Sequence, residues 1–275
     1  MPEQLEMRFW GVRGSIPTPE AANLGYGGNT SCVEFRYGGL PPMIFDGGSG
    51  LRQLGLALER EFPSGGECRI FFTHFHWDHI QGVPFFSPMY RPDWAIRFCS
   101  SHEPEVLETS LAEQMRPPFF PVTMPAKRAV RSHEQVDGNG LAMDGVRVRP
   151  ILLHHPNGSI GYRVDAGGHS IVYATDHEHG DAATDRGLTE QAAGADILIY
   201  DAQYTPDEYE SRRGWGHSTW ERGAHLARQA GVQQLVLFHH EPLRSDEGVS
   251  AIVKEAQAIF ANTIGATEGW HVSLG

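Results

Sequence analysis

Short apolar runs separated by glycine and proline recur along the whole chain, and this pattern predicts a protein rich in β-strands. Ten runs predict strands, at residues 7–12, 31–37, 42–45, 68–73, 95–99, 146–153, 159–164, 169–175, 196–200 and 233–238. Four stretches predict helices, at residues 51–61, 104–114, 218–230 and 247–261. The first places Leu51, Leu54 and Leu58 on one face, and the run from Ser218 to Glu221 has the pattern of a capping box at a helix start.

Strands and helices interleave in both halves of the chain, with no repeat and no long linker between them. This order favours the α/β class, with two sheets packed face to face and helices outside, over a single doubly wound sheet. We therefore expect one domain over residues 1–275.

Composition narrows the function classes. The chain has 275 residues, 40% of them apolar, and a formal net charge of −12, so a surface for long nucleic acid is not expected. No apolar run approaches the roughly 20 residues that span a bilayer and no signal-peptide pattern is visible, so we expect a cytoplasmic protein without a membrane partner. The cysteines Cys32, Cys68 and Cys99 are widely spaced, which predicts buried thiols rather than disulfides or a thiolate zinc site.

Histidine is unusually frequent, with 15 residues, and four metal-competent side chains follow the predicted strand 68–73 within six positions. They form the run H-x-H-x-D-H, made of His74, His76, Asp78 and His79. Two residues apart in an extended chain, His74 and His76 point the same way and can reach one ion. Asp78 and His79 lie beyond the strand end and can reach a second ion.

This run resembles the signature of the metallo-β-lactamase superfamily, whose fold is a four-layer αβ/βα sandwich with the site at one edge. The resemblance implies three further ligands, each at the end of a predicted strand. His155 is selected because His155 and the following Gly-Tyr-Arg resemble a segment of the phosphodiesterase and RNase Z-like branch, with His154 as the neighbouring alternative. Asp176 matches the bridging carboxylate, and His239 closes the second site, with His240 as the alternative.

The ligand set implied by the resemblance predicts a centre of two divalent metal ions. His74, His76 and His155 would hold one ion, Asp78, His79 and His239 the other, and Asp176 would bridge them. Imidazole and carboxylate ligands suit zinc, our first expectation, and also manganese or iron. Two ions about 3.5–4 Å apart activate water and clamp an oxyanion, so hydrolysis is the expected reaction. We predict Asp78 and His217 as the catalytic residues.

The segment Gly-Trp-Gly-His217-Ser-Thr closely resembles RNase Z-like enzymes, in which this histidine is implied to give a proton to the leaving group. His217 also precedes a predicted helix start, where backbone N–H groups favour an anion such as phosphate. The alternative is that His217 only helps to cap that helix. Asp201 is expected to orient His217, and Asp46 resembles the upstream acidic motif that orients a ligand or its loop.

The substrate is less constrained than the centre. True tRNA-processing members carry a long arm between the residues matching His155 and Asp176, and here these are only 21 positions apart. We therefore expect a small phosphodiester, such as a cyclic nucleotide or cyclic ribose phosphate, with Arg13 or Asn29 touching phosphate. A base would rest on an aromatic ring, that of Trp215, Phe119 or Tyr204.

Alternative functions remain open. They are an RNA 3′-end endonuclease of RNase Z type, a thioester or lactam hydrolase on the same fold, and a metal-binding regulator without turnover. The resemblance also allows a homodimer, to which an aromatic loop around Phe119 and Phe120 could contribute.

Overall fold

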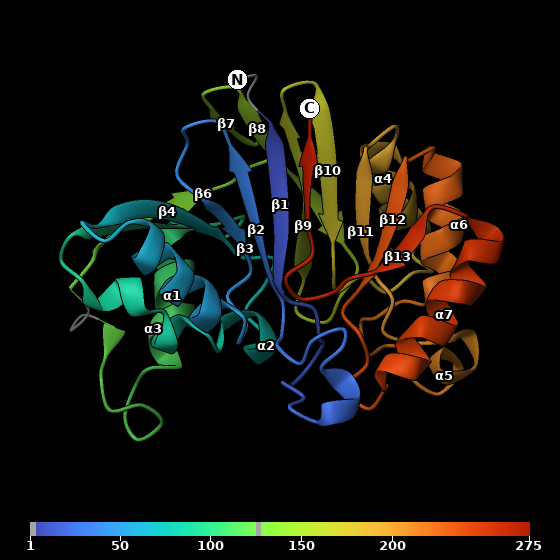
Figure 1. The fold of residues 1–275 in the computed structure, drawn as a ribbon, viewed down its shortest axis with the longest axis horizontal. Coiled ribbons are helices and arrows are strands. Elements are labelled where there is room, and N and C mark those ends of the chain that lie inside the picture. The colour runs from blue at the N-terminus through green and yellow to red at the C-terminus, as the bar shows by residue number, and fades with distance from the viewer. Residues whose placement is uncertain (1–3, 125–127) are drawn as a thin grey trace.

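Two sheets of seven strands each form the centre of the structure, a computed structural model that describes residues 4–124 and 128–275 (Figure 1). In spatial order, the first sheet contains β14 (His271–Leu274), β1 (Leu5–Gly11), β2 (Cys32–Tyr37), β3 (Met43–Phe45), β4 (Gly66–Phe71), β5 (Trp94–Ser100) and β6 (Val130–Gln135). The second contains β13 (Thr263–Gly265), β12 (Gln234–Phe238), β11 (Ile197–Asp201), β10 (His169–Ala174), β9 (Ser159–Ala166), β8 (Val146–Leu153) and β7 (Leu141–Met143).

Seven helices of the described residues lie on the outer faces of the sheets or at one end of them (Figure 1). They are α1 (Leu51–Glu61), α2 (Trp77–Ile80), α3 (Pro104–Glu113), α4 (Ala182–Ala192), α5 (Pro206–Glu210), α6 (Trp220–Ala230) and α7 (Asp246–Ile259), with 3-10 turns η1 (Ala21–Asn23), η2 (Val83–Phe85) and η3 (Ser87–Tyr90). Helices α1 and α3 pack on the first sheet, α4, α6 and α7 cover the second, and α2 and α5 lie at one end of the sheets (Figure 1). No helix among the described residues is long and apolar enough to cross a membrane.

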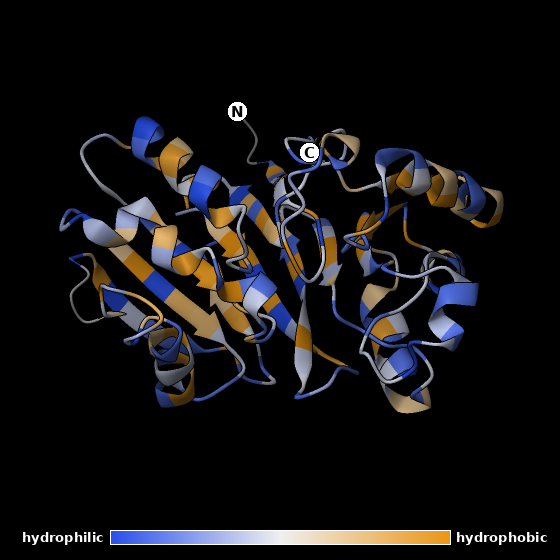
Figure 2. Ribbon diagram, turned by 90° about the horizontal axis from the view of Figure 1, so that it is seen from below, coloured by the Kyte–Doolittle hydropathy of each residue, from blue (hydrophilic) through white to orange (hydrophobic). Residues whose placement is uncertain are grey.

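The main hydrophobic core fills the space between the two sheets. Aromatic side chains from both sheets meet there, with the rings of Phe45 and Phe71 stacked at 4.8 Å and Tyr162 edge-on to Phe45 at 5.2 Å. One further apolar cluster lies between each sheet and the helices that cover it. Seen from below, hydrophobic residues concentrate on the central strands, and the flanking helices carry both hydrophobic and hydrophilic residues (Figure 2). The four-layer α/β sandwich predicted from the sequence is therefore confirmed.

The strands that the sequence pattern missed are β6, β7, β13 and β14, which are the four edge strands of the two sheets. Edge strands are short or partly exposed, as in β6, so they lack the apolar run that marks a central strand. The four predicted helices correspond to α1, α3, α6 and α7, so the pattern also missed α4 and the short helices α2 and α5. Helix α6 begins at Trp220, two residues later than the predicted range 218–230, because the N-cap is Thr219, whose hydroxyl accepts the backbone N–H of Arg222 at 3.2 Å.

Parallel pairing determines where functional residues can gather. Strands β3 to β6 run parallel in the first sheet, and β10 to β13 do so in the second. The carboxyl ends of these strands open onto the end of the molecule where Figure 1 shows α2. The loops that follow β3, β4, β8, β10, β11 and β12 carry the residues of the candidate site.

Candidate metal centre

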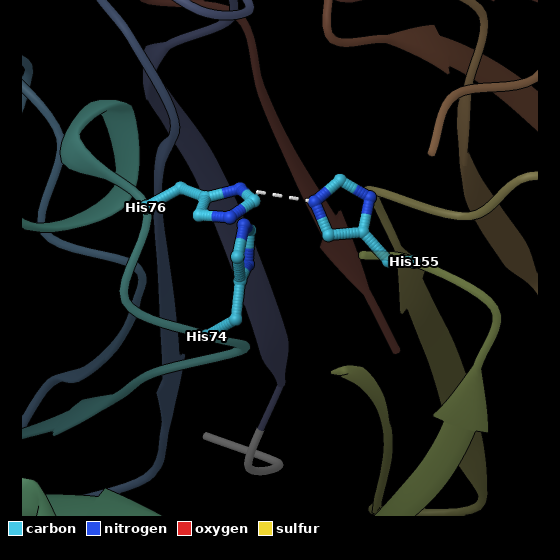
Figure 3. Close-up of side chains that lie close together, drawn as sticks. All are labelled: His74, His76 and His155. Carbon is cyan, nitrogen blue, oxygen red and sulfur yellow. Dashed lines mark hydrogen bonds between the residues drawn. The ribbon is translucent and has the colours of Figure 1, made fainter. Parts of the chain in front are cut away.

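The first ligand cluster joins the loop after β4 to the loop after β8. His74 and His76 extend from the first loop and His155 faces them from the second (Figure 3). His155 Nε2 lies 3.0 Å from His76 Nδ1, and the ring of His74 lies edge-on to both other rings. Three imidazole nitrogens therefore converge on one point, as a shared ion requires.

The second cluster contains Asp78, His79, Asp176 and His239. His79 Nε2 lies 3.3 Å from Asp78 Oδ2 and 3.1 Å from Asp176 Oδ2. His239 Nε2 lies 3.2 Å and 3.4 Å from the same two oxygens. All four side chains are buried, so they meet in a region from which bulk water is excluded.

Asp176 connects the two clusters. Its Oδ2 faces the second cluster, whereas its Oδ1 lies 3.7 Å from His74 Nε2 and 3.8 Å from His155 Nε2. One carboxylate thus offers a separate oxygen to each cluster. This geometry suits a ligand that bridges two ions.

The residues present fit two divalent cations. Two ligand atoms held at about 2.0–2.2 Å by one tetrahedral ion are roughly 3.3–3.6 Å apart, close to the separations seen here. In addition, Nε2 of both His74 and His79 is buried without a hydrogen-bond partner among the described residues. A buried lone pair that faces other acceptors is costly unless a proton or a cation fills the gap.

Three of the histidine ligands, His79, His155 and His239, are oriented through their other ring nitrogen. His79 donates from Nδ1 to Asp46 at 2.8 Å, and His155 donates from Nδ1 to the carbonyl of Gly216 at 2.8 Å. His239 donates from Nδ1 to Gln203 Oε1 at 2.8 Å. These bonds fix the tautomer that leaves Nε2 as a lone pair for a metal.

Asp46 organises the floor of the site. Its carboxylate accepts hydrogen bonds from the backbone and hydroxyl of Thr73, from His79 and from the hydroxyl of Tyr173 at 2.9 Å. It therefore ties β3 to the ligand loop and to the second sheet. Its backbone, like that of Asp176 and His239, is left-handed, with φ values of 62°, 58° and 59° respectively. Such conformations are uncommon for these residues and cluster at functional sites.

Charge differs between the two clusters. Burial lowers the pKa of His79, but the carboxylates of Asp176 and Asp78 outweigh it and hold that pKa well above its ordinary value. Burial is likewise overcome at His239, where Asp176 and Asp78 raise the pKa to about 9. Burial and the neighbouring His79 instead lower the pKa of His74 well below its ordinary value. Without metal, the second cluster therefore pairs two carboxylates with two histidines that hold their protons, whereas the histidines of the first cluster are kept neutral, the state in which imidazole binds a metal.

His217 lies beside both clusters. Its Nδ1 donates to Asp201 Oδ2 at 2.8 Å, and its ring stacks on His239 with centroids 4.9 Å apart. Asp201 also accepts the backbone N–H of Asp176 at 3.1 Å, so one carboxylate links the bridging residue to His217. His217 lies two residues before Thr219, the N-cap of α6, and it leaves its Nε2 on the side away from Asp201.

A cleft of about 520 Å³ opens next to His217. Its walls are Ser15, Gln203, Tyr204, Arg212, Trp215, His217, Glu241, Pro242 and Leu243. Trp215 is 62% exposed, so its ring is free to contact a bound molecule. The guanidinium of Arg212 lies over the ring of Tyr204 at 5.0 Å. The cleft thus offers aromatic surface and one cation beside the ligand clusters.

The placement of Arg13 and Asn29 does not support the expectation that they touch phosphate. Arg13 is fully buried, and its guanidinium donates to backbone carbonyls, including those of Gly27 at 2.8 Å and Arg244 at 2.7 Å. Asn29 donates from its backbone and its amide to Glu268. Both side chains hold loops together, because their polar groups are already satisfied by the protein.

The neighbouring histidines that were alternatives lie outside the clusters. The ring of His154 bonds to the carbonyl of Glu178 at 3.1 Å, and that of His240 donates to the carbonyl of Ala266 at 2.8 Å. His177, which follows Asp176, also lies outside the clusters: it is buried and contacts Asp185 at 3.1 Å.

Several supporting residues were missed by the sequence analysis. Gln203 orients His239, the backbone N–H of Ser15 donates to Asp78 Oδ2 at 2.8 Å, and Glu178 holds the loop before His217. Their partners are far away in sequence, so no local pattern marks them. The one available signal was position, since Gln203 follows the strand that ends at Asp201 and Glu178 follows Asp176 by two residues.

Comparison with known proteins identifies the family. A family model described as a beta-lactamase superfamily domain matches residues 44–240. Ribonuclease Z from Synechococcus sp. (strain WH7803) is 26% identical over 318 aligned positions, covering 94% of this chain and 93% of the relative.

Two solved structures share the fold over nearly their whole length. The metallo-beta-lactamase fold protein YhfI from Bacillus subtilis has a TM-score of 0.74 at 17% identity and covers 98% of this chain and 99% of its own. A diphosphatase from the PhnP family has a TM-score of 0.73 at 19% identity and covers 98% of both chains. Together with the ligand clusters at the sheet edge, these matches confirm the resemblance carried by the sequence motifs: the chain belongs to the metallo-β-lactamase superfamily of hydrolases, in its RNase Z-like branch.

Proposed function

We propose that the protein is a phosphodiesterase that uses two divalent metal ions to hydrolyse a small phosphodiester. The observation that carries this proposal is the His217–Asp201 pair, which lies between the ligand clusters and an aromatic-walled cleft. A hydrolase that expels an alkoxide benefits from a proton donor at this place, whereas many other reactions of the fold do not need one.

The residues divide the work as follows. His74, His76 and His155 would hold one ion, Asp78, His79 and His239 the other, and Asp176 both. When bound, two such ions would activate water and neutralise charge on the phosphoryl oxygens.

His217 acts on the leaving group. Asp201 accepts a hydrogen bond from Nδ1–H of His217 and stabilises the protonated ring. Nε2 can then give its proton to the departing oxygen. Asp201 also accepts a hydrogen bond from the backbone N–H of Asp176, and this bond fixes the position of His217 relative to the bridging carboxylate. The proton thus moves from Nε2 to the oxygen of the broken P–O bond.

Three features support a small substrate. The cleft of about 520 Å³ can take a mononucleotide-sized molecule, with Trp215 exposed for a base. The segment between His155 and Asp176 consists of β9, a Gly167-Gly168 turn and β10, with no inserted arm. The net charge of −12 also disfavours long nucleic acid.

The test compares substrates on the metal-loaded protein. We expect faster hydrolysis of cyclic nucleotides and of bis(p-nitrophenyl) phosphate than of precursor tRNA, with the metal content measured in parallel. The variant His217→Ala should lower kcat by roughly 10²- to 10⁴-fold while the metal content stays unchanged. The control variant His271→Ala, at an exposed position on β14, should behave like the wild type.

One other function is favoured by a specific observation. The relative from Synechococcus that matches 94% of this chain is named ribonuclease Z, so RNA 3′-end cleavage is the second candidate. Preference for precursor tRNA over every small phosphodiester would select it. Turnover of a thioester or β-lactam that is equal in wild type and His217→Ala would instead reject both phosphodiester functions.

A further inference from the structure

The loop between α5 and α6 carries Trp215 into the cleft and ends at His217. We propose that Glu178 is the positioning residue of this loop: its buried carboxylate fixes the loop against the candidate metal centre. Only the kinetic part of the test below rests on the proposed function.

The carboxylate of Glu178 contacts this loop and the last turn of α5, which leads into it. One carboxylate oxygen accepts the backbone N–H of Gly214 at 2.7 Å and the hydroxyl of Tyr209 at 3.0 Å. The other oxygen accepts the backbone N–H of Gly216 at 2.8 Å. Glu178 is only 5% exposed, and no Lys or Arg of the described residues forms an ion pair with it. Burying a carboxylate without a cation costs free energy, and these three hydrogen bonds from neutral donors offset that cost. We take this as a sign that the carboxylate serves to hold the loop.

The same loop also orients a metal ligand. The carbonyl of Gly216 accepts the Nδ1 proton of His155 at 2.8 Å, while the N–H of Gly216 is held by Glu178. A side chain at Gly216 would place its Cβ 2.2 Å from His155 Nδ1, so the loop is docked against the ligand. Fixing Gly216 therefore fixes the ring of His155 on one side and the position of His217 on the other.

Glu178 further connects the loop to the bridging ligand. It lies two residues after Asp176, and its own backbone N–H donates to the carbonyl of His154 at 2.7 Å. One short segment after β10 thus touches the bridging carboxylate, the strand end that carries His155 and the loop that carries His217. Loss of the carboxylate would release the loop without removing any group that contacts a metal or a substrate.

The test uses the full-length protein and the isosteric variant Glu178→Gln. An amide offers a single acceptor oxygen and turns N–H groups toward the loop donors, so at least one loop bond is lost. The matched control is Glu210→Gln, which removes an exposed acid that pairs with Arg213 at 2.7 Å in the same region. Tyr209→Phe, which deletes the hydroxyl bond to Glu178 together with the longer one to the carbonyl of His179 at 3.3 Å, serves as a milder second variant.

The first readout needs no substrate. Arg212 and Arg213 lie in the loop, so trypsin can report its opening, with the cut positions assigned by mass spectrometry. We expect cleavage after these residues to be roughly tenfold faster in Glu178→Gln and intermediate in Tyr209→Phe, at an unchanged melting temperature. Equal cleavage rates in wild type, Glu178→Gln and Tyr209→Phe would overturn the proposal.

The second readout is kinetic, with bis(p-nitrophenyl) phosphate as the probe. Because His217 and Trp215 both move, we expect kcat to fall roughly 10- to 100-fold and KM to rise in Glu178→Gln, with Glu210→Gln unchanged. A faster tryptic cut with unaltered kcat and KM would show that the loop is anchored but not positioned for reaction, and would also overturn the proposal. If the wild type hydrolyses no phosphodiester, the proposed function fails, while the tryptic comparison still decides the role of Glu178.

Discussion

At the scale of single residues, Asp176 is the most constrained position of the site. Its two oxygens face different clusters, its backbone N–H is held by Asp201, and its φ of 58° is left-handed. Among ordinary side chains, Asn adopts this backbone conformation most readily besides Asp. A change to Asn therefore isolates the charge of the carboxylate from the shape of the turn.

We expect Asp176→Asn to lower the bound metal from two ions to one or fewer per chain, because a neutral amide bridges cations poorly. Hydrolytic activity should fall by about 100-fold or more. Metal analysis by mass spectrometry after gel filtration measures the first effect. Asp207→Asn, at an exposed position on α5, is the control, and two ions retained by Asp176→Asn would contradict the bridging role.

The protonation of His239 predicts how metal affinity depends on pH. Without metal, the carboxylates of Asp176 and Asp78 raise its pKa to about 9, so the ring carries a proton at neutral pH that a metal must displace. Affinity should thus increase with pH, by roughly tenfold per unit for each displaced proton, and level off above about pH 9. Competition with a chromophoric chelator measures this slope. An affinity that is flat from about pH 6 to 9 would contradict it.

At the scale of elements, the conformation of the loop before α6 decides how the site is closed. Gly214 and Gly216 both have left-handed backbones, with φ values of 84° and 88°. A Cβ on Gly214 would meet nothing within 4 Å, whereas one on Gly216 would collide with His155 and Pro156. Both glycines thus need a positive φ, but only at Gly216 would a side chain collide with its neighbours.

Gly216→Ala should therefore lower kcat by roughly tenfold or more, because the loop must move away from His155. Gly214→Ala should lower the free energy of unfolding by a similar amount, about 1 kcal/mol, because alanine disfavours a positive φ. It causes no collision, so its kcat should stay close to that of the wild type. Steady-state kinetics and thermal melting of the pair separate the two effects. Equal losses of kcat in both variants would mean that backbone strain alone is responsible.

The elements also show how far sequence reasoning reaches. The ten central strands were predicted because each carries an apolar run or an alternation of apolar and polar residues, while the four edge strands lack so clear a signal. Seven candidate ligands could be named because each follows a predicted strand and matches a family motif. Gln203 and Glu178 could not be named, since their partners His239 and Gly216 become neighbours only through the packing of separate loops.

At the scale of the whole molecule, the ligand clusters join the two sheets. His74, His76, Asp78 and His79 follow β4 of the first sheet, whereas His155, Asp176 and His239 follow strands of the second. Each cluster contains members from both sides. Ions bound there would hold the sheets together at this end, in addition to the apolar core between them.

Removal of metal should therefore destabilise the entire fold. A ligand present at about 100 to 1,000 times its dissociation constant stabilises the native state by roughly 3–4 kcal/mol. We expect a chelator to lower the melting temperature by several degrees, and a divalent ion to restore it. Differential scanning calorimetry with and without chelator measures the shift. An unchanged melting temperature after verified metal loss would show that the core alone maintains the sheet packing.

The pairing of β1 with β14 has a practical consequence. Leu5 lies directly opposite Leu274 in this antiparallel pair, so both ends of the described fold leave the molecule at one place (Figure 1). That place is at the opposite end of the sheets from α2. Apart from Ser15, the residues of the cleft lie in segments that follow the carboxyl ends of β11 and β12, at the same end as α2. A protein fused to either end, or a solid support attached there, would leave the cleft facing outward. The fold is thus suited to immobilisation and display, and to circular permutation through a short linker that joins the two ends.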